Sequence, residues 1–238
     1  MTGPAIRIAI TPGGGRIVHC AIPNAQGLLI GLPAIKVGQA LRRLHGICRE
    51  AQGLAGELAV AAAMGEAIAQ EELDRRIARV HAEARRETGL RLCLDWAVLI
   101  GERPQTELAR AVIAGDWSVV EASGLAERFL ARAPEALRPI FAARLAGAPV
   151  APDMHAPEPG VGVAGLTCAR GRLIHRAALH KGRVAAYTID APTARRFGPD
   201  GDAAALLAQC HGAEEAAWVM QAIDPCVEWA MDTAMEAA

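Results

Sequence analysis

The chain has 238 residues, of which 52% are hydrophobic and 21% charged, and its formal net charge is −1. This balance predicts a globular protein and excludes the strongly basic surface of a typical nucleic-acid-binding protein. Charged residues interrupt every long apolar segment, so we expect no membrane insertion. The N-terminus carries no visible secretory signal, so the expected compartment is cytoplasmic and the six cysteines are expected to be reduced thiols.

The first part of the chain predicts a hairpin followed by helices. Residues 5–22 form two short apolar runs around a Pro-Gly-Gly-Gly turn. From residue 35, apolar side chains recur every three or four positions, which is the period of a helix with one buried face. Helices are expected over 54–63, 66–86, 88–101, 104–114, 116–132 and 134–146. Because aromatic residues make up only 3%, small aliphatic side chains must fill the core.

The composition changes after these helices. Residues 147–165 contain four prolines and several glycines, which predicts an irregular connector. Residues 171–177 and 183–189 are short apolar runs on either side of a turn, and they predict a second hairpin. Residues 202–238 are expected to be helical, with Pro225 in the first turn of a helix.

These elements predict a mainly α protein with small β-hairpins, of the α+β class. We expect one domain over residues 1–238. It would consist of an N-terminal hairpin with the first motif helix (1–63), a helical bundle (64–146), a Pro/Gly-rich connector (147–166), and a hairpin with the C-terminal motif helices (167–238).

Two short cysteine motifs lie near opposite ends of the chain. Residues 43–48 read Arg-Leu-His-Gly-Ile-Cys, and residues 224–229 read Asp-Pro-Cys-Val-Glu-Trp. Each looks like half of a two-cysteine metal motif, R-x-C-G-x-C in the first case and D-P-C-x-x-C in the second. His45 stands in place of the first cysteine of one pattern, and Trp229 in place of the last cysteine of the other.

A third stretch links these motifs to one family. Residues 167–193 contain Arg-Gly-Arg-Leu-Ile-His, then Lys-Gly, a tyrosine and Ala-Pro-Thr. In order and spacing, the three stretches resemble the large subunit of nickel-iron hydrogenases, over roughly the first 60 and the last 75 residues. The resemblance implies a helical bundle like that of a truncated large subunit. In that family four thiolates hold nickel, and two of them bridge to an iron that carries two cyanides and one carbon monoxide, Fe(CN)2CO.

The resemblance also implies roles for four residues around the iron. Arg170 corresponds to the arginine beside the metal pair, and Thr193 to the hydroxyl residue that donates to a cyanide. Pro192 and Leu173 correspond to parts of the apolar lining. The side chains that such an iron unit needs are therefore present in the sequence.

The nickel ligands, in contrast, are incomplete, so neither nickel nor hydrogenase activity is expected. In this the chain resembles the hydrogenase expression/formation proteins of the HupK/HoxV type, which are implicated in assembling or carrying the iron unit. The resemblance implies a non-enzymatic scaffold that transiently binds Fe(CN)2CO through Cys48 and Cys226 and hands it to the hydrogenase large subunit. The implied partners are a hydrogenase maturation chaperone and the iron-cyanide assembly proteins.

The sequence leaves alternatives open for the iron ligands and for the function. Cys48 corresponds to a cysteine that bridges to the iron, whereas Cys226 corresponds to one that binds nickel only. Two thiolates on one iron therefore require a shifted cargo, with Cys168 or His45 as a further ligand. A metal-free structural large-subunit homologue in a heteromeric redox complex is a second function, and a redox-active thiol protein with a Cys48–Cys226 disulfide is a third.

The remaining cysteines and two histidines carry no motif. Cys20, Cys93 and Cys210 are expected to be small buried hydrophobic side chains. His175 and His180 are expected to be packing or surface residues of the second hairpin.

Overall fold

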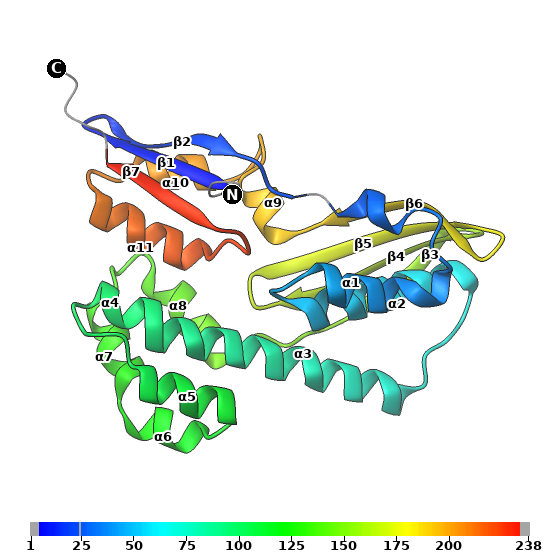
Figure 1. The fold of residues 1–238 in the computed structure, drawn as a ribbon, viewed down its shortest axis with the longest axis horizontal. Helices are drawn as coiled ribbons and strands as arrows, with labels where there is room; N and C mark the ends of the chain where they lie inside the picture. Colours follow the sequence, from blue (N-terminus) through cyan, green and yellow to red (C-terminus); the bar gives the residue numbers. More distant parts are fainter. Residues whose placement is uncertain (1–4, 24, 234–238) are drawn as a thin grey trace. The chain divides into compact units, whose positions relative to one another are not determined.

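The computed structural model describes residues 5–23 and 25–233, and its contacts divide the chain into two compact units (Figure 1). Unit 1 comprises Met1–Ile22, Arg85–Gly147 and Thr193–Ala238, and unit 2 comprises Pro23–Ala84 and Ala148–Pro192. Each unit combines segments that lie far apart in the sequence, so the unit boundaries differ from the four consecutive segments expected above. The single domain stays a prediction.

The structure is a mixed α/β protein with two small sheets, which fits the predicted α+β class. Both predicted hairpins are confirmed, the first within residues 5–22 and the second within residues 171–189. Across the described part of the chain, no helix combines the length and the apolar character that crossing a membrane requires.

Unit 1 contains a three-stranded sheet in the order β2-β1-β7. Strand β1 (Ile6–Thr11) pairs antiparallel with β2 (Gly14–Cys20) and parallel with β7 (Trp229–Thr233). The helices of this unit are α4 (Ala97–Leu99), α5 (Thr106–Ala114), α6 (Trp117–Ala122), α7 (Leu125–Arg132), α8 (Arg138–Ala146), α9 (Pro192–Arg196, which begins at the last residue of unit 2), α10 (Ala203–Ala208) and α11 (Ala213–Ile223). Its core centres on four aromatic rings with centroids 4.9 to 5.9 Å apart, those of Trp96, Phe129, Phe141 and Trp218.

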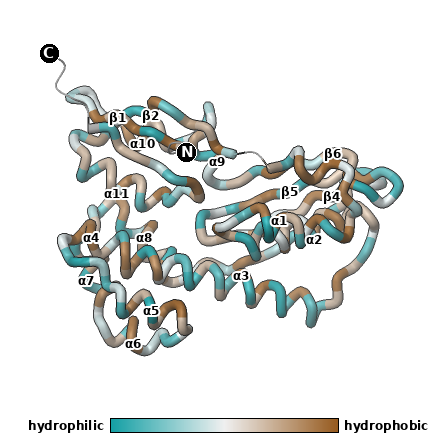
Figure 2. Tube along the Cα trace, viewed as in Figure 1, coloured by the Kyte–Doolittle hydropathy of each residue, from teal (hydrophilic) through white to brown (hydrophobic). Residues whose placement is uncertain are grey.

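Unit 2 is built on a four-stranded antiparallel sheet in the order β3-β4-β5-β6. The strands are β3 (Asp153–Glu158), β4 (Val161–Cys168), β5 (Gly171–His180) and β6 (Arg183–Asp190). Helix α2 (Arg49–Met64) packs on β4 and β5, and α1 (Val37–Leu44) packs on α2. Two short 3₁₀ turns, Gln26–Leu29 and Ala34–Lys36, precede α1. Helix α3 (Gln70–Arg91) begins in unit 2 and continues into unit 1 from Arg85, and it alternates brown and teal in Figure 2, as expected for a helix with one apolar face.

Small residues let the sheet of unit 2 approach α2 closely. A Cβ atom at Gly162 on β4 would overlap backbone atoms of Ala59 and Ala63 on α2. Gly56 on α2 leaves room in the same way for the hydroxyl of Tyr187. Tyr187 is the single tyrosine of the chain, and all three phenylalanines and all four tryptophans belong to unit 1. The core built from small aliphatic residues, which the composition predicts, is therefore found in unit 2.

The helical middle differs in detail from the prediction. Helix α3 continues without a break into a π-helical turn, Leu92–Trp96, and then α4, so the expected interruption near residue 87 is wrong. Within this turn the carbonyl of Cys93 accepts a hydrogen bond from the backbone N–H of Gln105 at 2.7 Å. The segment 116–132 is instead divided into α6 and α7 at Gly124, whose φ is +63°.

The predicted irregular connector over 147–165 is wrong in part, because residues 147–152 are irregular but the rest contains β3 and the first part of β4. Strand β3 is an exposed edge strand, and its pairing with β4 is irregular between His155 and Glu158. Pro157 lies within this irregularity, where the missing N–H interrupts no regular ladder. The prolines of this segment are therefore compatible with a strand at the edge of a sheet.

The predicted helix over 202–238 is also wrong in part. Helix α11 ends at Ile223, so Pro225 follows a helix and does not begin one. Residues 229–233 form β7 and pair with β1, which lies at the other end of the chain. No local pattern encodes a pairing between such distant segments.

Candidate functional site

The turn after β4 places Arg170 against Cys48. Ala169 and Arg170 form this two-residue turn, between Cys168 at the end of β4 and Gly171, whose φ is +120°. Arg170 Nη1 donates a hydrogen bond to Cys48 Sγ at 2.7 Å, across 122 positions of sequence. A neighbouring guanidinium favours the thiolate, which is the form of cysteine that binds metals. The structure thus brings two predicted site residues together within unit 2.

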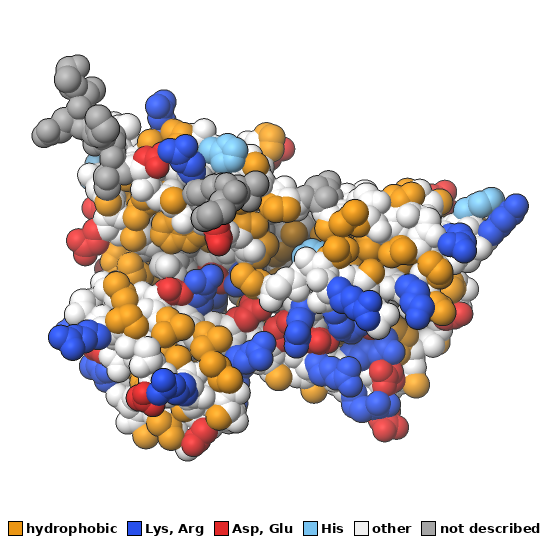
Figure 3. Space-filling view, viewed as in Figure 1, with side chains coloured by type: hydrophobic (Ala, Val, Ile, Leu, Met, Phe, Trp, Pro, Cys, Tyr) orange, Lys and Arg blue, Asp and Glu red, His pale blue; other side chains and the backbone are white. Residues whose placement is uncertain are grey.

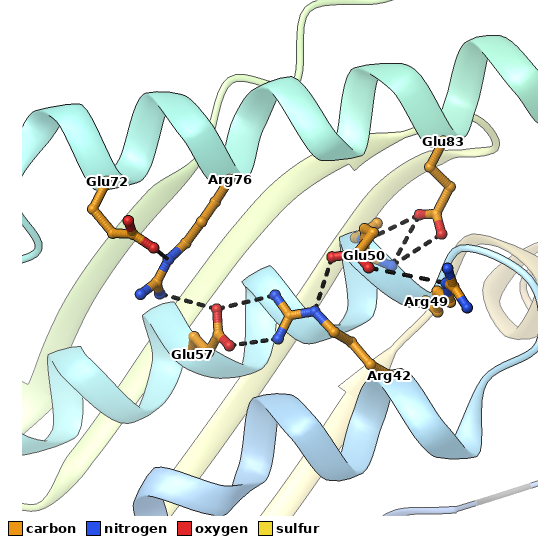
Figure 4. Close-up of polar contacts among 8 residues, drawn as sticks. Arg42, Arg49, Glu50, Glu57, Glu72, Arg76 and Glu83 are labelled. Carbon is orange, nitrogen blue, oxygen red and sulfur yellow. Dashed lines mark hydrogen bonds and ion pairs between the residues drawn. The ribbon is translucent and has the colours of Figure 1, made fainter. Parts of the chain in front are cut away.

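The backbone of Cys48 is held at the start of α2. Cys48 directly precedes this helix and has a left-handed φ of 55°. The carboxylate of Glu83 on α3 accepts the backbone N–H groups of Glu50 at 3.0 Å and of Ala51 at 3.2 Å (Figure 4). These N–H groups have no partner within α2 itself, so the buried carboxylate accepts their hydrogen bonds. Its negative charge also interacts favourably with the positive, N-terminal end of the helix dipole.

A network of ion pairs connects helices α1, α2 and α3 near Cys48. Arg42 on α1 contacts Glu50 at 2.9 Å and Glu57 at 2.5 Å, both on α2 (Figure 4). Arg76 on α3 contacts Glu57 at 2.9 Å and Glu72 at 2.6 Å. The hydrogen bond with Glu57 raises the pKa of Arg42 above its usual value. Figure 3 shows the resulting mixture of basic and acidic side chains on this part of unit 2. Since each arginine contacts carboxylates, we assign this network a structural role.

Cys168, Leu173 and Pro192 also lie around the turn of Arg170. Cys168 and Leu173 are buried and share one apolar cluster with Cys48. The Cys168 thiol donates to the carbonyl of Gly171 at 3.3 Å. Pro192 is buried, and a Cβ atom on Gly171 would lie 3.8 Å from its Cβ. Apolar groups and a second thiol therefore belong to the same region of unit 2 as Cys48.

His45 directly follows α1, three residues before Cys48. Its Nδ1 lies 3.0 Å from the carbonyl oxygen of Leu41. A carbonyl oxygen only accepts, so Nδ1 is assigned the hydrogen, and in the corresponding tautomer the lone pair lies on Nε2. A histidine that binds a metal through one ring nitrogen commonly donates a hydrogen bond to a carbonyl from the other. His45 therefore has a nitrogen suited to bind a metal.

The C-terminal motif forms a separate group in unit 1. The backbone N–H of Cys226 donates to Thr193 Oγ1 at 3.1 Å. The hydroxyl therefore accepts from the motif backbone, and its own hydrogen is not used in this bond. Asp224, two residues earlier, is 2% exposed and contacts Arg91 at 2.9 Å and Arg144 at 2.7 Å. Trp229 begins β7 opposite Ile6 and packs, partly buried, against the core of unit 1.

The predicted site residues thus form two groups, each within one unit. His45, Cys48, Cys168, Arg170, Leu173 and Pro192 belong to unit 2, and Thr193 and Cys226 belong to unit 1. Within residues 5–23 and 25–233, no group of three or more His, Cys, Asp or Glu side chains has the arrangement of a metal site.

The cysteines without a motif follow the prediction in two of three cases. Cys93 and Cys210 are buried, and burial raises the pKa of the Cys93 thiol to about 11. Cys20 is exposed on β2, so its predicted burial is wrong.

Three charged residues that hold the two motifs were missed by the sequence analysis: Glu83, Arg91 and Arg144. A signal existed for Glu83, because it continues the apolar stripe of Leu73, Ile77 and Val80 on α3. A charged residue on an apolar stripe indicates a buried partner. Nothing in the sequence distinguishes Arg91 or Arg144 from the other arginines of the helical middle.

A comparison with protein-family models finds no match to this chain, and neither does a search of the curated proteins.

Proposed function

We propose that this protein is a maturation scaffold for nickel-iron hydrogenase that transiently binds Fe(CN)2CO and hands it to the hydrogenase large subunit. The contact between Arg170 and the sulfur of Cys48 carries this proposal. It joins two segments that each resemble the family, and it sets a cationic donor beside a motif thiol. The bond between Thr193 and the backbone of Cys226 pairs a third and a fourth predicted residue.

The chemistry of these residues suits the cargo. Iron(II) with cyanide and carbon monoxide ligands is soft and favours thiolate, which Cys48 and Cys226 can supply. Cyanide nitrogen accepts hydrogen bonds, and Arg170 and Thr193 are donors. Carbon monoxide favours an apolar wall, and Leu173 belongs to the same apolar cluster of unit 2 as Cys48.

Further ligands come from unit 2. Cys168 offers a second thiol in the same apolar cluster as Cys48, and His45 offers Nε2. Either ligand would resolve the mismatch at Cys226, which corresponds to a cysteine that binds nickel only. We therefore include both in the proposed cargo site.

The same residues argue against a working hydrogenase. Tryptophan has no metal-binding atom, and imidazole is neutral and harder than thiolate, so His45 and Trp229 leave the nickel ligands incomplete. A carrier must release its cargo, and a smaller ligand set favours release. We propose a non-enzymatic role in the cytoplasm, with a hydrogenase maturation chaperone and the iron-cyanide assembly proteins as partners.

Infrared spectroscopy of protein purified without oxygen, after co-expression with the maturation machinery, tests this function. We expect cyanide and carbonyl stretching bands in the wild type and their loss in Cys48→Ser. Cys226→Ser should weaken or lose them, and Arg170→Ala should shift them. Cys20→Ser is the matched control, because Cys20 is exposed and lies outside both groups.

Absence of the bands from the wild type, or bands that neither serine substitution changes, would contradict the proposal. Iron-free protein in a stable complex with an iron-sulfur subunit would instead support the structural-subunit alternative. A Cys48–Cys226 disulfide, detected by differential alkylation of thiols, would support the redox alternative.

A further inference from the structure

The carboxylate of Asp224, in the C-terminal motif, is held by two arginines. Arg91 Nε contacts Oδ1 at 2.9 Å, and Arg144 Nη2 contacts Oδ2 at 2.7 Å. The aspartate is 2% exposed and the arginine from α8 is 8% exposed, so this part of the cluster is removed from water. A buried carboxylate with a cation on each oxygen has one favoured orientation.

This carboxylate belongs to a backbone turn that needs support. Asp224 directly follows α11 and has a left-handed φ of 48°, and its N–H donates to the carbonyl of Met220 at 2.8 Å. The left-handed region costs aspartate more than glycine, although aspartate adopts it more readily than most residues do. Pro225 then has a restricted φ, and the N–H of Cys226 donates to Thr193. Residues 224–226 are therefore held at one end by the arginine contacts of Asp224 and at the other by the hydrogen bond from Cys226 to Thr193.

The arginines come from the helical middle, which carries no motif of the family. Arg91 is the last residue of α3, directly before the π-helical turn, and it also pairs with Asp95 at 2.6 Å. Arg144 lies on α8, with its guanidinium carbon 5.1 Å from the centroid of the Trp96 ring. The two arginines and two aspartates sum to zero charge. The contacts of this cluster fix where the Asp224 carboxylate lies.

We infer that Arg91 and Arg144 are positioning residues that hold the Asp224 turn so that Cys226 presents its sulfur to a soft, thiolate-binding iron cargo. This inference rests on the proposed function. It assigns the helical middle a task in that function, namely the presentation of the C-terminal ligand.

The reactivity of the Cys226 thiol tests the positioning without any iron. Alkylation by iodoacetamide, followed residue by residue by mass spectrometry, should be about fivefold faster at Cys226 in Arg91→Ala because the turn opens more often. Arg91→Lys should restore part of the slow rate. Cys20 is the internal control, and its rate should not change. Arg85→Ala is the matched variant, since Arg85 also lies on α3 but contacts Glu121 and Trp117.

Circular dichroism establishes that each variant is folded, and Arg144→Lys provides a second variant at the buried position. The inference is overturned if both Arg91→Ala and Arg144→Lys are folded and iodoacetamide alkylates Cys226 in each of them at a rate within about twofold of the wild-type rate. If Arg91→Ala does not fold, Arg91→Gln, which also removes the charge, decides by the same criterion.

Infrared spectra separate this inference from the proposed function. In loaded protein, Arg91→Ala should shift or weaken the carbonyl band, whereas Arg85→Ala should leave it unchanged. Wild-type protein without bands contradicts the proposed function. Wild-type protein with bands that Arg91→Ala leaves unchanged contradicts only the positioning role.

Discussion

At the scale of single residues, His175 shows how a motif residue can have a structural role. It is fully buried on β5, with Nδ1 2.8 Å from the Tyr187 hydroxyl and Nε2 2.9 Å from Gln52 Oε1. The amide oxygen only accepts, so Nε2 is assigned the hydrogen and Nδ1 accepts from the tyrosine. Burial, and secondarily the charge of His45, lowers the pKa of His175 to about 3. The expected packing role is therefore confirmed.

This histidine predicts a pH dependence of stability. Its pKa is about 3 in the folded state and about 6.5 in the unfolded state, so only the unfolded chain takes up its proton between these values. The stability that the neutral ring contributes is complete above pH 6.5 and is lost as the pH falls toward 3. Between pH 7 and 5 the free energy of unfolding should fall by about 2 kcal/mol more in the wild type than in His175→Gln.

Urea denaturation at the two pH values measures this difference. The other titrating groups are common to both proteins and cancel in the comparison. Equal pH dependence of the wild type and His175→Gln would show that His175 is not held neutral by the fold.

The site residues divide according to whether a local pattern identifies them. Cys48, Cys226 and Arg170 lie in short motifs, and the sequence alone singles them out. Arg91 and Arg144 do not, because their partner is a carboxylate 80 or more positions away.

At the scale of elements, the contact of α2 with β4 depends on the absence of side chains. The substitution Gly162→Ala should destabilise unit 2 by about 3 kcal/mol, because the new methyl group would meet the backbone of Ala59, which no rotamer change can move away. Thermal unfolding followed by circular dichroism measures the loss. Gly27→Ala is the matched control, since no atom lies within 4 Å of its added Cβ, and a similar loss in both variants would contradict the close contact.

The sequence predicts a helix or a strand correctly where nearby residues determine it. The turn at Lys181 and Gly182 and the alternation around it predict β5 and β6 correctly. The sequence analysis missed strands β3 and β7 because these segments become strands only by pairing with a neighbouring strand. Strand β3 tolerates Pro157 as an edge strand, and β7 exists through its parallel pairing with β1.

At the scale of the whole molecule, the two units have separate cores of different composition. Unit 1 contains every tryptophan and phenylalanine, whereas Tyr187 is the single tyrosine of the chain and lies in the core of unit 2. Tryptophan fluorescence therefore reports on unit 1. Fluorotyrosine incorporated at residue 187 reports on unit 2 by its fluorine resonance.

These probes predict two separate unfolding transitions, because each unit buries its own apolar cluster. The urea midpoints of the two signals should differ. Gly162→Ala should lower the Tyr187 midpoint and leave the tryptophan midpoint unchanged. Coincident midpoints that move together in this variant would instead indicate a single cooperative transition.

The sequence by itself determined the α+β class, both hairpins and the motifs that carry Cys48, Arg170 and Cys226, whereas the small aliphatic core that the composition predicts holds for unit 2 and not for unit 1. Periodicity, turn residues and short motifs act over a few positions, so they can be recognised without a fold. Only the tertiary structure decided that Arg170 meets Cys48, that Thr193 accepts from Cys226, and which charged residues hold the two motif turns. The physical reason is that these contacts join positions 32 or more residues apart, whose approach depends on how whole elements pack.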